Sequence, residues 1–248
     1  MRFYCPELKP HATLALPPDE ATHAARVLRV SVGDACELFD GRGHFAAGTV
    51  ADASKRDVTV TAGEVIDDAR TLPGRLEVAI GLPKGDRQRS VIERATELGV
   101  HSLVPLDCEF GVAEATPAAI ARGLRTTIES CKQSGRNLLL GFGEPVGAVS
   151  YFANQPSDGS VLRLLCHPRI PDAVPMAMSS FESLCRQTPV QRVVLAIGPE
   201  GGFSEVEVAA ALTSGWIPLD LGTRILRVET ALSAAVTFAS LLLEPQAT

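Results

Sequence analysis

The sequence predicts an α/β protein of two parts, a small N-terminal β-barrel and a larger domain built on a parallel sheet. Short strands with a single helix fill residues 1–66, which is typical of a small barrel. From residue 75 onward, strands alternate with helical stretches, which indicates a parallel sheet with helices on both faces. A charged stretch ending in Pro-Gly, residues 67–74, separates the parts. We therefore predict a barrel over residues 1–70 and an α/β domain over 71–248.

The N-terminal strands are recognised by their alternation and by turn chemistry. They are expected at residues 13–16, 36–39, 45–50 and 58–61. Residues 40–43, Asp-Gly-Arg-Gly, have the composition of a hairpin turn between the second and third strands. Pro18 begins the one expected helix, in which Ala24, Val27 and Leu28 share a face.

The second part contains five expected strands, at residues 76–82, 103–106, 161–166, 193–197 and 217–221. The helix at 117–133 is two-sided, and Ile120, Leu124, Ile128 and Cys131 make its apolar face. The helix at 230–243 is apolar nearly all round, so the core, a partner subunit or both must cover it.

Composition excludes several classes of protein. With 46% apolar residues the 248-residue chain can form a packed core. No apolar run reaches the roughly 18 residues that a membrane span needs, and the N-terminus lacks the apolar stretch of a signal peptide. The cysteines stand singly, which favours neither a disulfide framework nor a metal site. A reduced cytoplasmic protein is the simplest interpretation.

Two glycine-bearing loops close together are the most informative feature. Residues 197–203, Ile-Gly-Pro-Glu-Gly-Gly-Phe, and residues 221–227 each follow a predicted strand and precede a helical pattern. Such loops meet at the carboxyl edge of a parallel sheet, where glycine lets the backbone approach a ligand. We therefore expect Gly198, Glu200, Gly201, Leu221 and Gly222 to line one pocket. The alternative for a single loop is an ordinary tight turn. No P-loop sequence is present.

The flanks of these loops add further candidates. Ser204 and Glu207 have the spacing of a capping box. Arg224 and Arg227 flank Ile225 and Leu226, which suits anion contacts beside an adenine-sized slot, although solvated arginines are the alternative. At the end of another strand, the remaining candidates for the pocket are Leu165, Cys166 and His167.

Basic residues cluster in two places despite a net charge of −6, which argues against indiscriminate nucleic-acid binding. Lys84, Arg87 and Arg89 follow a strand at the expected ligand edge. On the helix at 117–133, the cations Arg122, Arg125 and Lys132 recur at helical spacing, with Arg136 beyond it. A solvated face is the default for such charges, but the excess of cations favours a phosphate-binding stripe.

Several motifs in one order resemble the bacterial small-subunit ribosomal RNA methyltransferase E family of the SPOUT superfamily. They lie at residues 23–30, 38–41, 84–86, 95–100 and 133–137 and in both glycine loops, so the resemblance covers nearly the whole chain. One position departs from the family pattern, because Lys132 stands where the family usually has Glu.

This resemblance implies a PUA-like RNA-binding barrel, with Arg26 and Arg29 as RNA contacts, and a SPOUT domain with a C-terminal trefoil knot. It implies a homodimer that uses S-adenosylmethionine, without a metal, to methylate N3 of one uridine in small-subunit (16S) ribosomal RNA. Arg227 or Arg136 would then stabilise the developing uracil anion. Two alternatives remain, an RNA-binding assembly factor without catalysis and a nucleotide-binding enzyme of doubly wound type. The missing P-loop and GxGxxG motifs argue against the second.

Overall fold

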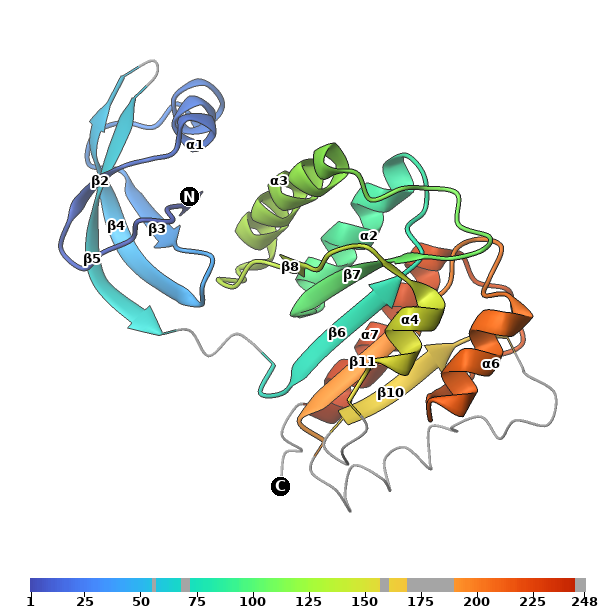
Figure 1. The fold of residues 1–248 in the computed structure, drawn as a ribbon. Helices are drawn as coiled ribbons and strands as arrows, with labels where there is room; N and C mark the ends of the chain where they lie inside the picture. The colour runs from blue at the N-terminus through green and yellow to red at the C-terminus, as the bar shows by residue number, and fades with distance from the viewer. Residues whose placement is uncertain (55–56, 68–71, 157–160, 169–189, 244–248) are drawn as a thin grey trace. The chain divides into compact units, whose positions relative to one another are not determined.

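The computed structural model describes residues 1–54, 57–67, 72–156, 161–168 and 190–243. The chain forms two compact units (Figure 1). Unit 1 comprises Met1–Thr71 and Ile128–Leu139, and unit 2 comprises Leu72–Thr127 and Leu140–Thr248. Residues 68–71 of the expected linker lie outside the described residues. No pattern in the sequence indicated that residues 128–139 pack with unit 1.

Unit 1 is built on a five-stranded mixed sheet, counted over its described residues. Its strands are β1 (Arg2–Tyr4), β2 (Thr13–Ala15), β3 (Ala35–Phe39), β4 (His44–Ala53) and β5 (Val58–Asp67). Their order is β1-β3-β4-β5-β2, with β1 parallel to β3 and the other pairs antiparallel. The predicted strands and the hairpin between β3 and β4 are confirmed. The short β1 was missed, and within the described residues the ladder is open at β1 and β2.

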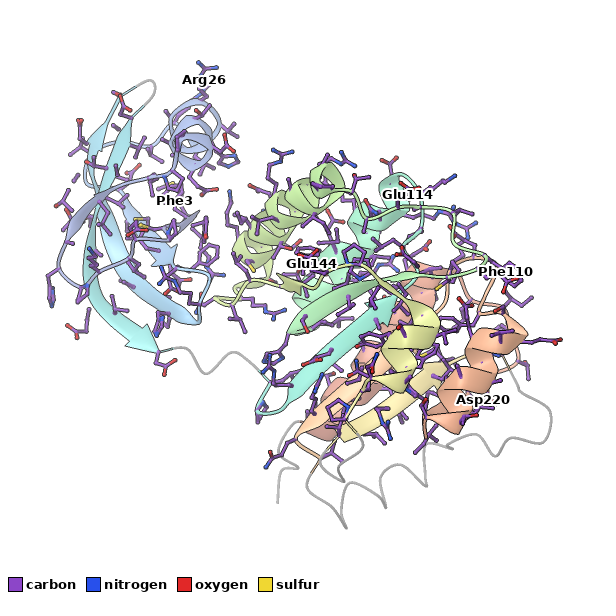
Figure 2. All side chains as sticks on the ribbon, viewed as in Figure 1. Phe3, Arg26, Phe110, Glu114, Glu144 and Asp220 are labelled. Carbon is purple, nitrogen blue, oxygen red and sulfur yellow. The ribbon has the colours of Figure 1, made fainter. Side chains whose placement is uncertain are left out.

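The sheet of unit 1 curls around its own apolar core. Two register shifts between β4 and β5 mark irregularities of the kind that increase local twist. Phe3, labelled in Figure 2, and Leu38 are completely buried there. Gly41, in the hairpin turn, has φ of 77°, and a Cβ on it would lie 2.8 Å from Cγ of Leu139. The hairpin therefore needs glycine both for its backbone angle and for its close packing.

The helical part of unit 1 differs from the prediction. Helix α1 (Pro18–His23) passes into a single wide turn, η1 (Ala24–Leu28), of π type. Ala24 is buried, but Val27 and Leu28 are 66% and 40% exposed, so the three predicted to share a face are not buried together. A π turn holds more residues per turn than an α-helix, so the later side chains rotate out of register.

Unit 2 contains a parallel sheet, as predicted. Its described strands are β6 (Arg75–Ile80), β7 (Ser102–Asp107), β8 (Gly141–Phe142), β9 (Val146–Gly147), β10 (Val161–Cys166), β11 (Arg192–Ile197) and β12 (Ile217–Leu219). The order is β12-β10-β11-β6-β7-β8, with β9 also paired to β7, and every one of these pairings is parallel. The two-residue strands β8 and β9 are too short to leave an alternating pattern and were missed.

Helices cover both faces of this sheet (Figure 1). Helices α2 (Asp86–Glu97) and α7 (Val228–Leu243) share one apolar cluster with the strands, and α4 (Ala148–Ala153) and α6 (Glu205–Thr213) share another. The three-layer arrangement predicted from the alternation of strands and helices is therefore confirmed. None of the helices in the described part of the chain has the length and apolar character needed to cross a membrane.

The sequence alone did not identify the buried sides of α3 (Pro117–Ser134) and α7, which the structure shows. In α3, Leu124 is 44% exposed, so the predicted apolar face is partly wrong. In unit 2 the buried side of α3 instead contains Gly123 and Thr127. The packing at Gly123 is close, since a Cβ there would lie 2.9 Å from Cζ of Phe142. In α7, Leu232 and Val236 are buried, while Leu241 is 56% exposed.

Lys132 is not a solvated cation on the face of α3, which corrects the prediction. Its Nζ lies 2.9 Å from Oε1 of Glu20 and 2.8 Å from Oε1 of Glu129. The Lys132 and Glu20 side chains are each only 7% exposed. Burial alone would lower the pKa of Lys132, but hydrogen bonds and charge from Glu129 and Glu20 raise it. Unit 1 thus contains a buried ion pair between two segments distant in sequence.

We expect Lys132→Met to lower the free energy of unfolding by about 3 kcal/mol, because Glu20 would keep a buried charge without its partner. Urea denaturation at neutral pH measures this. Exchanging the charges, Lys132→Glu with Glu20→Lys, should recover much of the loss seen for Lys132→Glu alone. Since the folded Lys132 has a raised pKa, the contribution is present at neutral pH and is lost as the pH rises through that raised value. Unchanged stability in Lys132→Met would contradict the assignment.

Candidate active site

A cavity of about 280 Å³ lies in unit 2 beyond the carboxyl ends of β10, β11 and β12. Its wall consists of the three loops that follow these strands and the first turn of α7. The structure brings together most of the residues that the sequence assigned to the pocket, namely Cys166, His167, Gly198, Glu200, Gly201, Leu221, Gly222, Ile225 and Leu226. Arg224, Val228 and Ala231 also line it.

The first glycine loop is shaped by close contacts within the protein. Gly202 has φ of 76° and donates from its N–H to the carbonyl of Pro199 at 2.8 Å. A Cβ on Gly198 would lie 3.1 Å from the backbone N of Phe203, and one on Gly201 would lie 2.7 Å from Cβ of Phe110. These two glycines thus allow the loop to fold on itself and against Phe110.

The loop passes into α6 through the predicted capping box, which is confirmed. Oγ of Ser204 accepts from the N–H of Glu207 at 3.4 Å, and Oε2 of Glu207 accepts from the N–H of Ser204 at 2.8 Å. Oε1 of Glu207 accepts in addition from the N–H of Glu109 at 2.9 Å. One buried carboxylate therefore fixes both the start of α6 and the loop after β7.

The second glycine loop forms the opposite wall. Gly222 has φ of 98°, and its N–H donates to Oδ1 of Asp220 at 2.8 Å. Ile225 lines the cavity yet is 95% exposed, so it stands at the rim. Backbone and apolar side chains thus make much of the wall, and charge enters through Glu200 and Arg224.

Three predicted site residues lie elsewhere. Leu165 is completely buried in the apolar cluster shared with α4 and α6 and does not line the cavity. Strand β10 is buried on both faces, so alternation in the sequence could not show the direction of this side chain. Arg227 is exposed beside the cavity lining, and its carbonyl accepts from the first turn of α7. Arg136 lies in unit 1 and is only 6% exposed.

The titratable groups at the cavity differ in burial and in their partners. Burial raises the pKa of the Cys166 thiol to about 12, so it stays protonated at neutral pH. Nδ1 of His167 lies 2.8 Å from the carbonyl oxygen of Pro168, which can only accept, so Nδ1 carries the proton. Oε1 of Glu200 forms an ion pair with Nη2 of Arg87 at 3.0 Å. Among the described residues no group of three His, Cys, Asp or Glu side chains could hold a metal ion.

The predicted RNA-binding residues fall into different settings. Arg26 and Arg29 are exposed on unit 1, and Figure 2 labels Arg26 on the η1 turn. In unit 2, Arg122 and Arg125 are exposed on α3. Lys84 is exposed just before α2, as is Arg89 within it, although Arg89 pairs with Glu93 at 2.7 Å.

Phe110 is a neighbour of the site that sequence reasoning missed: it does not line the cavity itself but lies against Gly201, which does. It follows β7 at the same edge of the sheet, where Figure 2 labels it. Its side chain is 46% exposed and packs against Gly201. A signal was available, because it stands a few residues after the predicted strand at 103–106. Only the order of the strands shows that this loop reaches the cavity wall.

Two known domain families match the sequence of this chain. The RNA methyltransferase domain family matches residues 70–240, and the RNA methyltransferase PUA domain family matches residues 16–62. The chain is thus a PUA-containing member of the RNA methyltransferase domain family.

Individual relatives show which family of RNA methyltransferases the chain is similar to. The chain is 31% identical to ribosomal RNA small subunit methyltransferase E of Synechocystis sp., over 96% of this chain and 76% of the relative. The structure of the Neisseria gonorrhoeae protein of that name, bound to S-adenosyl methionine, matches with a TM-score of 0.84 at 28% identity over 97% of both chains. A Legionella pneumophila methyltransferase in complex with the same cofactor matches with a TM-score of 0.82 at 31% identity, over 97% of this chain and 96% of that one. The chain belongs to the ribosomal RNA small subunit methyltransferase E family, as the resemblance predicted.

Two arginines of helix α2, Arg87 and Arg94, have different partners in the structure. Nη1 of Arg94 donates to the carbonyl of Glu229 at 3.0 Å and so fastens α2 to α7, whereas Arg87 forms a half-exposed ion pair. We expect Arg94→Ala to lower the free energy of unfolding by about 1–3 kcal/mol, and Arg87→Ala by less than about 1 kcal/mol. Urea denaturation of the two variants side by side measures the difference. Equal losses would show that Arg87 is also structural.

Proposed function

We propose that this chain transfers a methyl group from S-adenosylmethionine to small-subunit ribosomal RNA. The observation that carries the proposal is the cavity between the two glycine loops, in a chain that belongs to the ribosomal RNA small subunit methyltransferase E family. Relatives of that name, and solved structures with the cofactor bound, support both the reaction and the cofactor.

The residues at the cavity fit this cofactor. Backbone groups of residues 198–202 and 221–226 can bind the adenosine part, and Ile225 and Leu226 offer apolar surface for the base. Arg224 and Glu200 provide one charge of each sign, which suits a zwitterionic amino-acid end better than a polyphosphate. When bound, S-adenosylmethionine supplies a methyl group already activated on a sulfonium. The protonated thiol of Cys166 makes a covalent role for that side chain unfavourable.

We propose N3 of a uridine as the methyl acceptor, an assignment that rests on the family resemblance. N3 lies on the Watson–Crick edge, so the base must be unpaired or flipped out to react. The protein then contributes alignment of the base and positive charge near the uracil as the N3 proton leaves. Arg227, exposed beside the cavity lining, is our candidate for that charge.

The reaction is tested by incubating the protein with labelled S-adenosylmethionine and small subunits that lack the modification, and then mapping the methylated nucleotide by mass spectrometry. We expect one N3-methyluridine. A methyl group on a ribose 2′-oxygen or on a guanine would refute the acceptor. Tight cofactor and RNA binding with no transfer would favour an assembly factor without catalysis.

We also propose the trefoil knot of the SPOUT fold for residues at the C-terminal end. Strand β12 lies at the sheet edge beside β10, whereas α7, which follows it, packs against α2, β11 and β6. This proposal rests on the family resemblance, because sequence periodicity could never have indicated a knot.

We propose that the protein is a homodimer, because α7 leaves apolar surface uncovered in one chain. Leu241 is 56% exposed on this helix, and Ala234 and Thr237 are exposed beside it at helical spacing. Sedimentation should report about twice the chain mass of 26.2 kDa. Leu241→Glu should yield a folded monomer. Val206→Glu, at an equally apolar and 67% exposed position on α6, should leave the dimer intact.

Cofactor affinity should depend on the shape of the first glycine loop. We expect Gly201→Val to weaken S-adenosylmethionine binding at least tenfold, because its Cβ would lie 2.7 Å from Cβ of Phe110 and would displace the loop. Calorimetry on a variant with unchanged circular dichroism measures this. Gly147→Ala is the control, since a Cβ there meets nothing within 4 Å. Wild-type affinity in Gly201→Val would remove the loop from the binding site.

RNA affinity should depend on exposed arginines of α3. Reversing charge at Arg122 and Arg125 should weaken RNA binding and reduce its dependence on salt, because fewer counterions are released from the phosphates. Filter binding over a salt series measures both effects. S-adenosylmethionine affinity serves as the control and should not change. An unaltered salt slope would make these arginines an ordinary solvated face.

A further inference from the structure

The wall of the cavity continues outward along the carboxyl edge of the sheet, toward β6 and β7. Two consecutive residues of the first glycine loop each receive a neighbour from that side. Glu200 pairs with Arg87 at 3.0 Å, and Gly201 packs against Phe110. A cation from the first turn of α2 and an aromatic residue from the loop after β7 therefore contact adjacent residues of the wall.

Phe110 is held rather than loosely placed. The N–H of Glu109 donates to the buried carboxylate of Glu207 at 2.9 Å, and the N–H of Gly111 donates to the carbonyl of Cys108 at 2.9 Å. These two bonds fix the backbone on both sides of Phe110. Even so, its side chain is 46% exposed, so the fold fixes the backbone at an aromatic residue without burying the ring. A single exposed Phe is ordinary on a protein surface, but this one lies against Gly201, which lines the candidate active site.

The charges around Phe110 indicate what the ring contacts. On its own loop the neighbours are acidic, with Asp107 before it, Glu109 beside it and Glu114 beyond. These carboxylates repel phosphate. The cations follow the neighbouring strand β6 instead. Lys84 is exposed before α2, and Arg87, in the first turn of α2, forms an ion pair with Glu200. A nucleotide at this rim would therefore place its phosphate toward Lys84 and Arg87 and its uncharged base toward Phe110.

We propose that Phe110 stacks on the unpaired base of the RNA substrate at the mouth of the cavity and positions it for methyl transfer. This inference rests on the proposed function. Aromatic side chains are the usual platforms for unstacked bases, because every base presents a π face. The role is positional, since the ring carries no group that could take or give a proton.

Four variants test the proposal: Phe110→Ala, Phe110→Leu, Phe110→Tyr and, as a matched control, Val112→Ala. Val112 is a similarly exposed apolar residue of the same loop, at 45%. The measurements are kcat/KM for small subunits, affinity for a short oligouridylate, affinity for S-adenosylmethionine, and sedimentation.

We expect Phe110→Ala and Phe110→Leu to lower kcat/KM and oligouridylate affinity by about ten- to a hundredfold, the range that loss of one stacked base produces. Phe110→Tyr and Val112→Ala should stay within about threefold of the wild type, and cofactor affinity should not change in any variant. Wild-type values in Phe110→Leu would overturn stacking, because leucine keeps apolar bulk without a π face. Conversion of the dimer to a monomer by Phe110→Ala would also overturn it, by assigning the ring to a second copy of the chain.

The oligouridylate measurement separates this proposal from the proposed function. It needs no methyl transfer, so weakened binding in Phe110→Ala would support stacking even if the chain methylated no RNA. Conversely, a wild-type enzyme that methylates small subunits, with Phe110→Ala equally active and equally tight on oligouridylate, would remove the stacking role alone.

Discussion

The parallel register of the unit 2 sheet is the constraint on which the site depends. Cys166 is paired with Leu219 and with Ile197, and Ile197 is paired with Ile80, so four strands stop level with one another. Because all of them run in the same direction, the loops that follow must meet at one edge. The cavity, the glycine loops and the neighbouring basic and aromatic side chains are consequences of that single alignment.

Glu207 connects two of the loops at this edge of the sheet through hydrogen bonds. One carboxylate accepts from the backbone N–H groups of Ser204 and Glu109, which belong to loops after two different strands. Burying a carboxylate is costly unless its oxygens are hydrogen-bonded, and here both oxygens have partners. The same bonds that start α6 thus hold the first glycine loop and the loop of Phe110 in fixed relation, which a site for aligning two substrates requires.

Local patterns in the sequence predicted the features that depend on neighbouring residues. The turn at Gly222 and the capping box at Ser204 are decided within a few positions, so they could be identified. Features decided by distant packing could not. Leu165 lies in a strand buried on both faces, where alternation does not distinguish the cavity from the core. Lys132 looked like one more surface cation because its partner Glu20 is 112 positions away. Similarly, no local pattern joins residues 128–139 to unit 1.

The placement of charge explains how an acidic chain can act on RNA. Cations such as Arg94 and Lys132 make bonds within the protein, so counting them in the sequence overstates the basic surface. The net negative charge of the chain also has little effect on RNA binding at a given site, because charges further apart than about 8 Å are largely screened at physiological salt. What remains is local, such as exposed Arg122 and Arg125 on one helix and exposed Lys84 before α2. We therefore propose that RNA is selected by the positions of such cations and of Phe110 relative to the cavity, and not by the net charge of the chain.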